Sequence, residues 1–257
     1  MQVVILCGGS GTRLREETEF KPKPMIHVGG KPLLWHIMKL YSYWGHNEFV
    51  LALGYKQEMI KEYFYNFDLI NHDYRTKTGE PRIIKSYKMT DQWDVILADT
   101  GETTLKGSRL KRVEKYITGD TFMMTYGDGV ANVNIQALID FHYSHGKIAT
   151  VTGVHPAPRF GEILHKDGEV ISFSEKPYNG ENLVSGGFFV FNRKIFDYLH
   201  VEEWCDLEVG PLELLAQQKE LMVYHHKGYF GCMDTVSDMY LLNELWNKGE
   251  AKWKVWD

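Results

Sequence analysis

Glycines and charged side chains gather at a few points in this sequence, in combinations that suit the handling of phosphate. The first point is the segment CGGSGTRL, residues 7–14, which directly follows the apolar run VVIL. Glycines after a strand let a ligand approach the backbone closely, and such loops offer main-chain N–H groups to phosphate. The segment therefore predicts an anion-binding loop in which Arg13 supplies a positive charge.

Two familiar glycine loops do not match this segment. The dinucleotide fingerprint G-x-G-x-x-G, read from Gly9 and Gly11, requires Gly or Ala where Leu14 stands. The nucleoside-triphosphatase loop requires Lys and a hydroxyl residue after its last glycine, and no glycine of this loop precedes a lysine. A third kind of anion loop remains. The alternative is a tight turn with a surface arginine, but one turn rarely needs three glycines.

Two acidic residues are candidates for binding a metal ion. Asp128 lies between two glycines after the buried run TFMMTY. An exposed acid at a phosphate site suits Mg²⁺, which is usually held by one or two carboxylates plus phosphate oxygens of the substrate. Asp234, in CMDT, is the second candidate, although spacing alone favours a helix-capping role for it.

Two lysines next to prolines could contact the same phosphates. Lys23, in KPKPM, is held on an extended segment by its neighbouring prolines and could reach the anion bound near Arg13. A solvated basic linker explains this segment about equally well. Lys176, which precedes Pro177, has the same two explanations.

These side chains need a scaffold that brings them to one edge of a sheet, because open α/β sheets bind ligands beyond the carboxyl ends of their strands. Apolar runs of strand length alternate with segments of helical spacing, which predicts an α/β fold with a sheet that starts parallel. We expect one continuous sheet in a single domain, residues 1–257, to which the second half adds strands. The expected strands are 2–6, 49–55, 94–99, 121–129, 149–155, 184–192 and 221–226, with a hairpin over 161–177 that turns at Asp167-Gly168. The expected helices are 31–44, 56–64, 107–117, 135–146, 211–218 and 235–247, the last with Thr235 as N-cap.

The composition limits the class of protein. The 257 residues include 29 basic and 34 acidic side chains, and the net charge of −5 argues against a protein built to bind nucleic acid. The start MQVVILCGG lacks a secretory pattern and no stretch approaches a membrane span, so we expect a soluble cytoplasmic protein. The three cysteines lack the spacing of zinc or redox motifs and are expected to be small buried hydrophobes.

Two segments leave their roles open. The tail, residues 243–257, is rich in tryptophan and could pack on its own core or on a neighbouring copy, and we expect a homo-oligomer. Residues 65–81 show no clear period and could form a lid, an interface or a plain insertion.

The combination of GGSGTRL, KPKPM and VGGKPLL with GDG, EKP, SGGFFVF and a late aspartate resembles the sugar-1-phosphate nucleotidyltransferases over nearly the whole chain. The resemblance implies a doubly wound, mostly parallel mixed sheet flanked by helices, with a nucleotide-binding N-terminal half and a sugar-binding C-terminal half. It also implies a Mg²⁺-dependent enzyme that converts an NTP and a sugar 1-phosphate into an NDP-sugar and pyrophosphate. The segments DTGETTLKGSRLKRV and GDGVANVNI are most similar to family members that use CTP and glucose 1-phosphate.

The resemblance assigns roles to individual residues. Arg13 matches the arginine on the departing pyrophosphate and Lys23 the lysine at the triphosphate, while Asp128 and Asp234 match the metal-binding pair. The other matches are Gly8, Gly9, Gly11 and Thr12 in the loop around the nucleotide, Glu175 and Lys176 at the sugar and its phosphate, and Gly187 in the strand that contacts the hexose. TGETTLKGSR replaces the base loop of thymidylyltransferase relatives, which places base selection on Thr103, Gly107 and Arg109.

Other functions remain open. A family member could use UTP or dTTP, and a non-catalytic sensor could share the fold, although such a sensor would not need all of the charged residues that this chain retains. A nicotinamide oxidoreductase is disfavoured by Leu14, and a metal-dependent glycosyltransferase would need Asp-x-Asp where Asp128-Gly129-Val130 stands. His27, which stands where many relatives have proline, is expected to have little chemical consequence.

Overall fold

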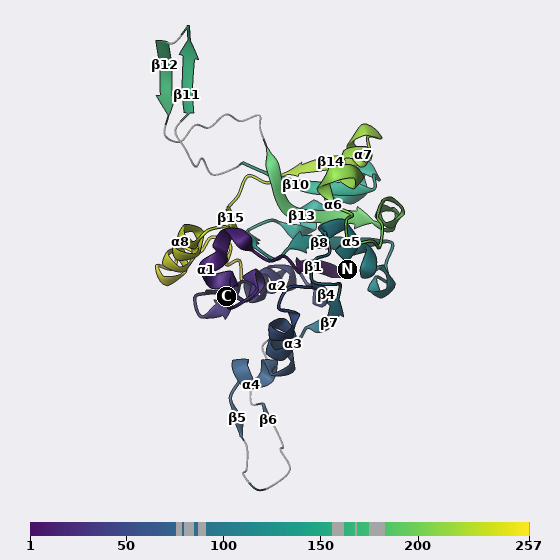
Figure 1. The fold of residues 1–257 in the computed structure, drawn as a ribbon, viewed down its shortest axis with the longest axis vertical. Helices are drawn as coiled ribbons and strands as arrows, with labels where there is room; N and C mark the ends of the chain where they lie inside the picture. Colours follow the sequence, from purple (N-terminus) through teal and green to yellow (C-terminus); the bar gives the residue numbers. More distant parts are fainter. Residues whose placement is uncertain are drawn as a thin grey trace.

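A seven-stranded sheet crosses the molecule in the order β14-β10-β13-β8-β1-β4-β7 (Figure 1). Its neighbouring strands are parallel except where β13 pairs with β10 and β8. The computed structural model describes residues 1–75, 79, 85–86, 91–155, 162–167, 169–174 and 183–256. The strands are β1 (Val3–Cys7), β4 (Glu48–Leu53), β7 (Asp94–Asp99), β8 (Thr121–Tyr126), β10 (Ala149–Val154), β13 (Val184–Asn192) and β14 (Leu221–His225). The predicted fold class, a mostly parallel mixed sheet with flanking helices, is confirmed.

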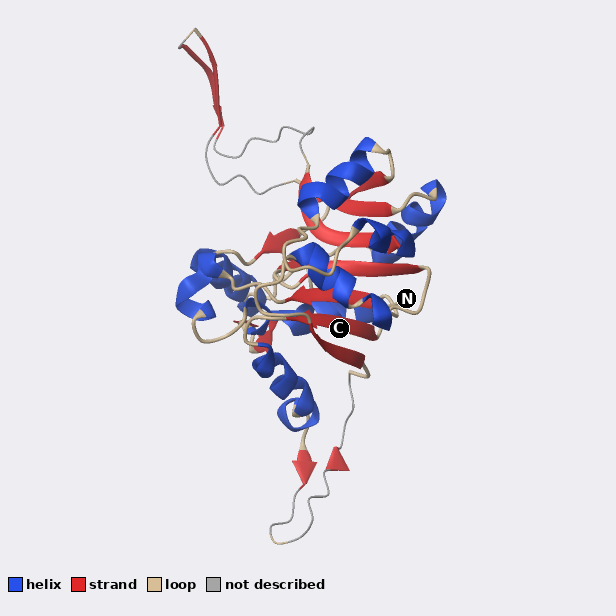
Figure 2. Cartoon of the chain, turned by 45° about the vertical axis from the view of Figure 1, so that its right-hand side comes forward, coloured by secondary structure: helices blue, strands red, loops and turns tan. Residues whose placement is uncertain are grey.

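Helices cover both faces of this sheet (Figure 2). The helices among the described residues are α1 (Arg15–Thr18), α2 (Leu33–Tyr43), α3 (Gln57–Tyr65), α4 (Phe67–Asn71), α5 (Lys106–Arg112), α6 (Ile135–His145), α7 (Glu213–Gln217) and α8 (Val236–Asn247). Short 3₁₀ turns form at Thr12–Leu14, Lys23–Met25, Glu114–Tyr116 and Arg193–Tyr198. No helix among the described residues is long and apolar enough to cross a membrane.

Two hydrophobic cores lie on opposite sides of the sheet. In β1, Val3 and Ile5 belong to the first core, whereas Val4 and Leu6 belong to the second. Helices α2 and α6 supply the first core, and α5 together with the 3₁₀ turn after β13 supplies the second. Because both faces are covered, the strands read as continuous apolar runs rather than as alternating patterns.

Small two-stranded pairs lie outside the central sheet. β9 (Gly129–Ala131) pairs with β15 (Phe230–Cys232), which joins the turn after β8 to the segment before α8. The short strands β2 (His27–Val28) and β3 (Lys31–Pro32) pair before α2, and β5 (Tyr74–Arg75) pairs with β6 (Lys85–Ser86). The predicted hairpin forms from β11 (Glu162–Lys166) and β12 (Glu169–Ser174) and lies apart from the central sheet in Figure 1.

Three expected elements differ from the structure. The helix expected over 107–117 ends at Arg112 and is followed by a separate 3₁₀ turn. The helix expected over 211–218 begins at Glu213, because Gly210, with φ of 100°, and Pro211 make a kinked turn before it. The strand expected over 121–129 ends at Tyr126, since the following residues turn away to pair with β15.

The tryptophan-rich tail packs on its own chain. Trp253 is 1 % exposed and its indole N–H donates to Nδ1 of His36 in α2 over 3.4 Å. The Nε2 of His36 lies 2.8 Å from the carbonyl of Val28, and burial lowers the pKa of His36 to about 4. A neutral imidazole therefore links the tail to α2, and these tryptophans complete the first core.

The segment over 65–81, whose role the sequence left open, starts beside α3. Phe67 of α4 stacks on Phe64 of α3, with ring centroids 6.0 Å apart. Residues 76–78 and 80–81 lie outside the described residues, so the choice among lid, interface and insertion stays open.

Candidate active site

A cavity of about 440 Å³ opens where β1 and β8 end and β13 begins. Its lining includes Gly8, Gly9 and Gly11, then Lys23 and Pro24, the start of α5 (Thr104, Leu105, Lys106 and Arg109), residues 125–129, residues 185–188, and Phe230, Cys232 and Asp234. A more open hollow of about 1000 Å³ lies between α3, α4 and β7 and contains none of the predicted site residues. The chemistry predicted from the sequence therefore belongs to the first cavity, at the carboxyl edge of the parallel strands.

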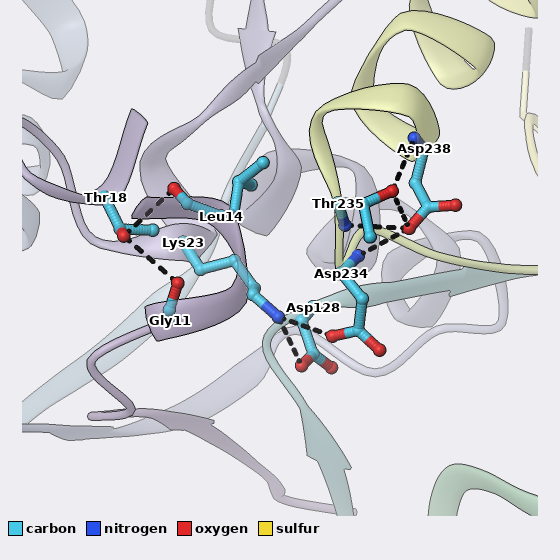
Figure 3. Close-up of polar contacts among 8 residues, drawn as sticks. All are labelled: Gly11, Leu14, Thr18, Lys23, Asp128, Asp234, Thr235 and Asp238. Carbon is cyan, nitrogen blue, oxygen red and sulfur yellow. Dashed lines mark hydrogen bonds and ion pairs between the residues drawn. The ribbon is translucent and has the colours of Figure 1, made fainter. Parts of the chain in front are cut away.

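The ammonium group of Lys23 joins two carboxylates from distant parts of the chain (Figure 3). Its Nζ lies 2.8 Å from an oxygen of Asp234 and 3.3 Å from an oxygen of Asp128. Lys23 is only 8 % exposed, so the contact is partly shielded from water, which strengthens its electrostatics. Three residues that the sequence assigned to metal and triphosphate thus meet directly.

Prolines fix the segment that carries Lys23. Pro22 is extended, with φ of −65°, and Pro24 lies inside the short 3₁₀ turn that follows. The next residues, Met25 and Ile26, are buried in the first core. Since proline restricts itself and the residue before it, the turn has little freedom and directs Lys23 to the sheet edge. The alternative of a solvated basic linker is wrong for this segment.

The charges of the three residues do not cancel. Burial raises the pKa of Asp128, the nearby Asp234 raises it further, and the ammonium of Lys23 offsets part of this rise. Burial lowers the pKa of Lys23, but the two carboxylates outweigh burial and its pKa lies above the ordinary value. Two acids share one cation, and this arrangement favours the binding of a second cation.

A helix cap leaves the carboxylate of Asp234 available to Lys23. Thr235 is the N-cap of α8 and forms a capping box with Asp238, whose carboxylate accepts from the backbone N–H groups of Asp234 and Thr235 (Figure 3). The predicted N-cap is confirmed. The capping role that spacing favoured for Asp234 therefore belongs to Thr235 and Asp238.

Cys232 places a thiol beside the acid pair. Its Sγ and one oxygen from each of Asp128 and Asp234 all lie within 4.8 Å of one another. Burial and the two carboxylates raise the pKa of Cys232, so the group is a neutral thiol near pH 7. Cys7 and Cys205 are buried as expected, whereas Cys232 is only partly buried and belongs to the site.

The guanidinium of Arg109 fills the space beside Gly8. Its terminal nitrogens donate to five oxygens, among them the carbonyls of Leu53 at 3.1 Å and Gly8 at 2.9 Å. A Cβ on Gly8 would lie 2.1 Å from Nη1 of Arg109, so the glycine makes room for this side chain. The close approach at Gly8 thus comes from the protein itself, and Arg109 braces the loops around the cavity. Gly9, by contrast, has open space where its Cβ would be.

An ion pair and a tyrosine line the side of the cavity formed by α5. The Nζ of Lys106 lies 2.5 Å from Glu208, and the hydroxyl of Tyr126 donates to the same carboxylate. Gly187 lies against the ring, because a Cβ there would be 2.8 Å from Cδ2 of Tyr126. The φ of Gly187, +74°, also favours glycine over any other residue.

Several predicted residues do not line the cavity in the described structure. Thr12 is exposed in its 3₁₀ turn, and the hydroxyl of Thr103 donates to Glu203 over 3.0 Å. Gly107 is buried, and a Cβ there would lie 2.7 Å from the carbonyl of Asp206, so its role is packing. The side chain of Arg13, and the whole of Glu175 and Lys176, lie outside the described residues.

Residues of the cavity lining that were not predicted from the sequence include Cys232, Lys106 and Tyr126. Cys232 precedes Asp234 by two positions at the end of a strand, and the period of two could have placed both on one side. Lys106 is the first residue of α5 and Tyr126 is the last residue of β8, but their partner Glu208 is 82 positions from Tyr126. No local pattern signals such a contact.

Comparisons with known proteins identify the family of this chain. A family model described as Nucleotidyl transferase matches residues 2–235. A glucose-1-phosphate cytidylyltransferase of Salmonella typhimurium is 48 % identical over 258 residues, covering 100 % of both chains. A probable glucose-1-phosphate cytidylyltransferase of Bacillus subtilis is 43 % identical over 256 residues, again covering 100 % of both.

A solved structure supports the fold. HddC from Yersinia pseudotuberculosis superimposes with a TM-score of 0.66 at 24 % identity, covering 95 % of this chain and 99 % of that one. The family match over most of the chain, together with relatives of this similarity over its full length, shows that the chain belongs to the nucleotidyl transferase family.

Proposed function

We propose that this protein transfers the cytidylyl group of CTP to glucose 1-phosphate, giving CDP-glucose and pyrophosphate. The observation that carries the proposal is the meeting of Lys23, Asp128 and Asp234 beside the glycine loop, in one cavity at the carboxyl edge of the sheet. The two cytidylyltransferases that are similar along the whole chain support CTP and glucose 1-phosphate as substrates.

The reaction needs positioning and charge neutralisation rather than a covalent intermediate. A phosphate oxygen of glucose 1-phosphate attacks the α-phosphorus of CTP, the bond from that phosphorus to the α–β bridging oxygen of CTP breaks in line, and this oxygen leaves as a terminal oxygen of pyrophosphate. Both reactants are anions, so cations must lie between them. In this proposal Lys23 holds the triphosphate, Arg13 neutralises the departing pyrophosphate, and Glu175 and Lys176 hold the sugar and its phosphate.

The acid pair fits a divalent cation. Mg²⁺ takes oxygen ligands and is usually held by one or two carboxylates plus substrate phosphates, and Asp128 and Asp234 offer these oxygens at the cavity wall. When bound there, Mg²⁺ would supply positive charge to the phosphate oxygens. The excess of negative charge over the single ammonium of Lys23 supports this assignment.

The base contacts are proposed at the two residues that precede α5. Thr104 and Leu105 line the cavity, whereas Thr103 and Gly107 do not, so the proposal moves base selection to Thr104 and Leu105. Arg109 contributes indirectly, because it fixes carbonyls of the loops on either side. Gly8, Gly9, Gly11 and Thr12 remain the proposed loop around the nucleotide, and Gly187 the proposed hexose contact.

The test is pyrophosphate release from purified protein with glucose 1-phosphate and Mg²⁺, comparing CTP, UTP, dTTP and ATP. We expect a clear preference for CTP. When the same assay is applied to Asp128→Asn, the matched control is Asp140→Asn, which changes an exposed acid of α6 whose carboxylate accepts from Gln136. Release with UTP or dTTP alone would overturn the choice of base, and CTP binding without release would indicate a non-catalytic sensor.

Two further expectations stay proposals. We treat residues 1–257 as a single domain with a nucleotide-binding N-terminal half and a sugar-binding C-terminal half. A homo-oligomer is still proposed, but it no longer rests on the tail, whose Trp253 is covered within the chain. Light scattering of the purified protein tests this.

A further inference from the structure

Three side chains form a closed cluster on the side of the cavity formed by α5. The hydroxyl of Tyr126 donates to one oxygen of Glu208, and the Nζ of Lys106 lies 2.5 Å from the other. The same ammonium lies 5.4 Å above the ring centroid of Tyr126. Lys106 and Tyr126 line the cavity, and Glu208 stands behind them.

The backbone holds Glu208 in place. Its N–H donates to the carboxylate of Asp206 over 2.8 Å, and Leu207 between them is fully buried in the second core. The carboxylate is thus a fixed anchor for the two groups that face the cavity.

Lys106 differs from the other cations that line the described part of this cavity. Lys23 is held between two acids, and the terminal nitrogens of Arg109 donate to five oxygens. Lys106 has one carboxylate partner and a side chain that is 41 % exposed. Its ammonium has three N–H donors, so at least one of them is available to a ligand. The pair has no net charge and suits hydroxyl groups, which donate and accept, better than a further anion.

The surface next to this pair suits a sugar ring. Residues 185–187 of β13 line the cavity, two of them are glycines, and Gly187 lies against the ring of Tyr126. The space of a Cβ is filled by Val154 at Gly186 and by the ring of Tyr126 at Gly187, so neither glycine places a side chain of its own in the cavity and a sugar ring can reach the backbone there. The ion pair borders this stretch through Tyr126.

We propose that the Lys106–Glu208 pair, resting on Tyr126, binds hydroxyl groups of the hexose of the sugar 1-phosphate. Lys106 contacts the sugar, and Glu208 is a positioning residue that acts through Lys106. This inference rests on the proposed function and names a determinant of its sugar specificity.

The first experiment measures steady-state kinetics of Lys106→Met and Glu208→Gln with CTP and glucose 1-phosphate. We expect the KM for glucose 1-phosphate to rise about tenfold or more, the loss typical of a hydrogen bond to a charged group, while the KM for CTP stays within twofold. Lys106→Arg should restore part of the affinity. The matched control is Lys111→Met, which removes another lysine of α5. The Nζ of Lys111 lies 2.8 Å from an oxygen of Glu114, and Lys111 does not line the cavity.

A second experiment compares glucose 1-phosphate with its monodeoxy analogues in the parent protein and in Lys106→Met. The parent should discriminate against at least one analogue about tenfold, and the variant should largely lose this discrimination. Unchanged discrimination, or a defect confined to CTP, overturns the inference even if the parent makes CDP-glucose normally. Thermal melting shows whether Glu208→Gln is misfolded. If it is, the kinetics of Lys106→Met test the inference, because the side chain of Lys106 is partly exposed and its replacement should not disturb the fold.

Discussion

The two sides of the cavity hold their cations in different ways. On the side of α2, Lys23 lies between two carboxylates, and the cluster keeps an excess of negative charge. On the side of α5, Lys106 has a single carboxylate partner, and the pair is neutral. In our proposal, the excess negative charge marks the side that binds a further cation and then phosphates, and the neutral pair marks the side that binds hydroxyl groups.

Arg109 shows a third arrangement within the same cavity. Its terminal nitrogens donate to four main-chain carbonyls and one hydroxyl, and no carboxylate is among these acceptors. Burial and the nearby Arg112 lower the pKa of Arg109. A cation used in this way holds loops together, so its position in the cavity does not by itself make it a ligand contact.

The largest effect should come from removing one acid on the side of α2. Asp128→Asn keeps the size of the side chain but leaves one carboxylate for the metal, so we expect the turnover number to fall at least about a hundredfold. Pyrophosphate release at saturating CTP and glucose 1-phosphate measures this. Turnover within threefold of the parent would contradict the metal assignment and, with it, the proposed difference between the two sides.

Lys23→Met should have opposite effects on metal binding and on turnover. Without nucleotide, the ammonium competes with a metal ion for the same two carboxylates, so its removal should tighten Mn²⁺ binding about tenfold. Turnover should nevertheless fall on the order of tenfold or more, because the triphosphate loses a charged partner. Calorimetry of Mn²⁺ binding and the release assay measure the two effects.

The pH dependence of Lys23→Met gives an independent check. The ammonium lowers the pKa of Asp128, which burial and Asp234 raise, so its loss should move that pKa further up. Metal binding requires the deprotonated acid, so it weakens as the pH falls. The midpoint of this loss should lie at a higher pH in the variant than in the parent. An unchanged or lower midpoint would show that Lys23 and Asp128 are not coupled.

Cys232→Ser should weaken the binding of metal ions that prefer sulfur and leave the binding of ions that prefer oxygen unchanged. Thiol sulfur favours soft ions such as Cd²⁺, whereas Mg²⁺ prefers oxygen, so the variant should bind Cd²⁺ about tenfold more weakly and keep Mg²⁺-dependent turnover within twofold. Calorimetric titration with Cd²⁺ measures the first effect. Cys7→Ala serves as the control, because that thiol is buried and outside the donor set. Equal Cd²⁺ binding by parent and Cys232→Ser would remove sulfur from the site.

The residues that could be predicted from the sequence are those that follow strands. Lys23, Asp128 and Asp234 each come just after or between predicted elements, and parallel strands bring such points to one edge. The residues that could not be predicted make contacts with residues far away in the sequence. Glu208 lies behind the lining residues in the kinked segment Glu208–Leu212, and a local pattern in the sequence gives no sign of its contact with Tyr126.

The role of Arg109 could not be predicted from the sequence either. Its position before a helical segment is compatible with a ligand contact or with a brace, and only the three-dimensional arrangement brings the carbonyls of Gly8 and Leu53 to one guanidinium. The sequence predicted that a ligand approaches the backbone at Gly8, whereas the group that fills the space beside it in the structure is the guanidinium of Arg109. The approaching group could not be predicted, because it comes from a residue 101 positions away.

The smallest effect is expected from Gly187→Ala, on the side of α5. The added methyl would lie 2.8 Å from the ring of Tyr126, on a backbone with φ of +74°, so we expect a loss of about 1–2 kcal/mol in the free energy of unfolding. Displacement of the ring should raise the KM for glucose 1-phosphate a few-fold and leave metal binding unchanged. Gly146→Ala is the matched control: it has a similar φ of +64°, but nothing lies within 4 Å of its Cβ position. If both variants raise the KM equally, the effect comes from general destabilisation, and Tyr126 does not transmit it to the sugar.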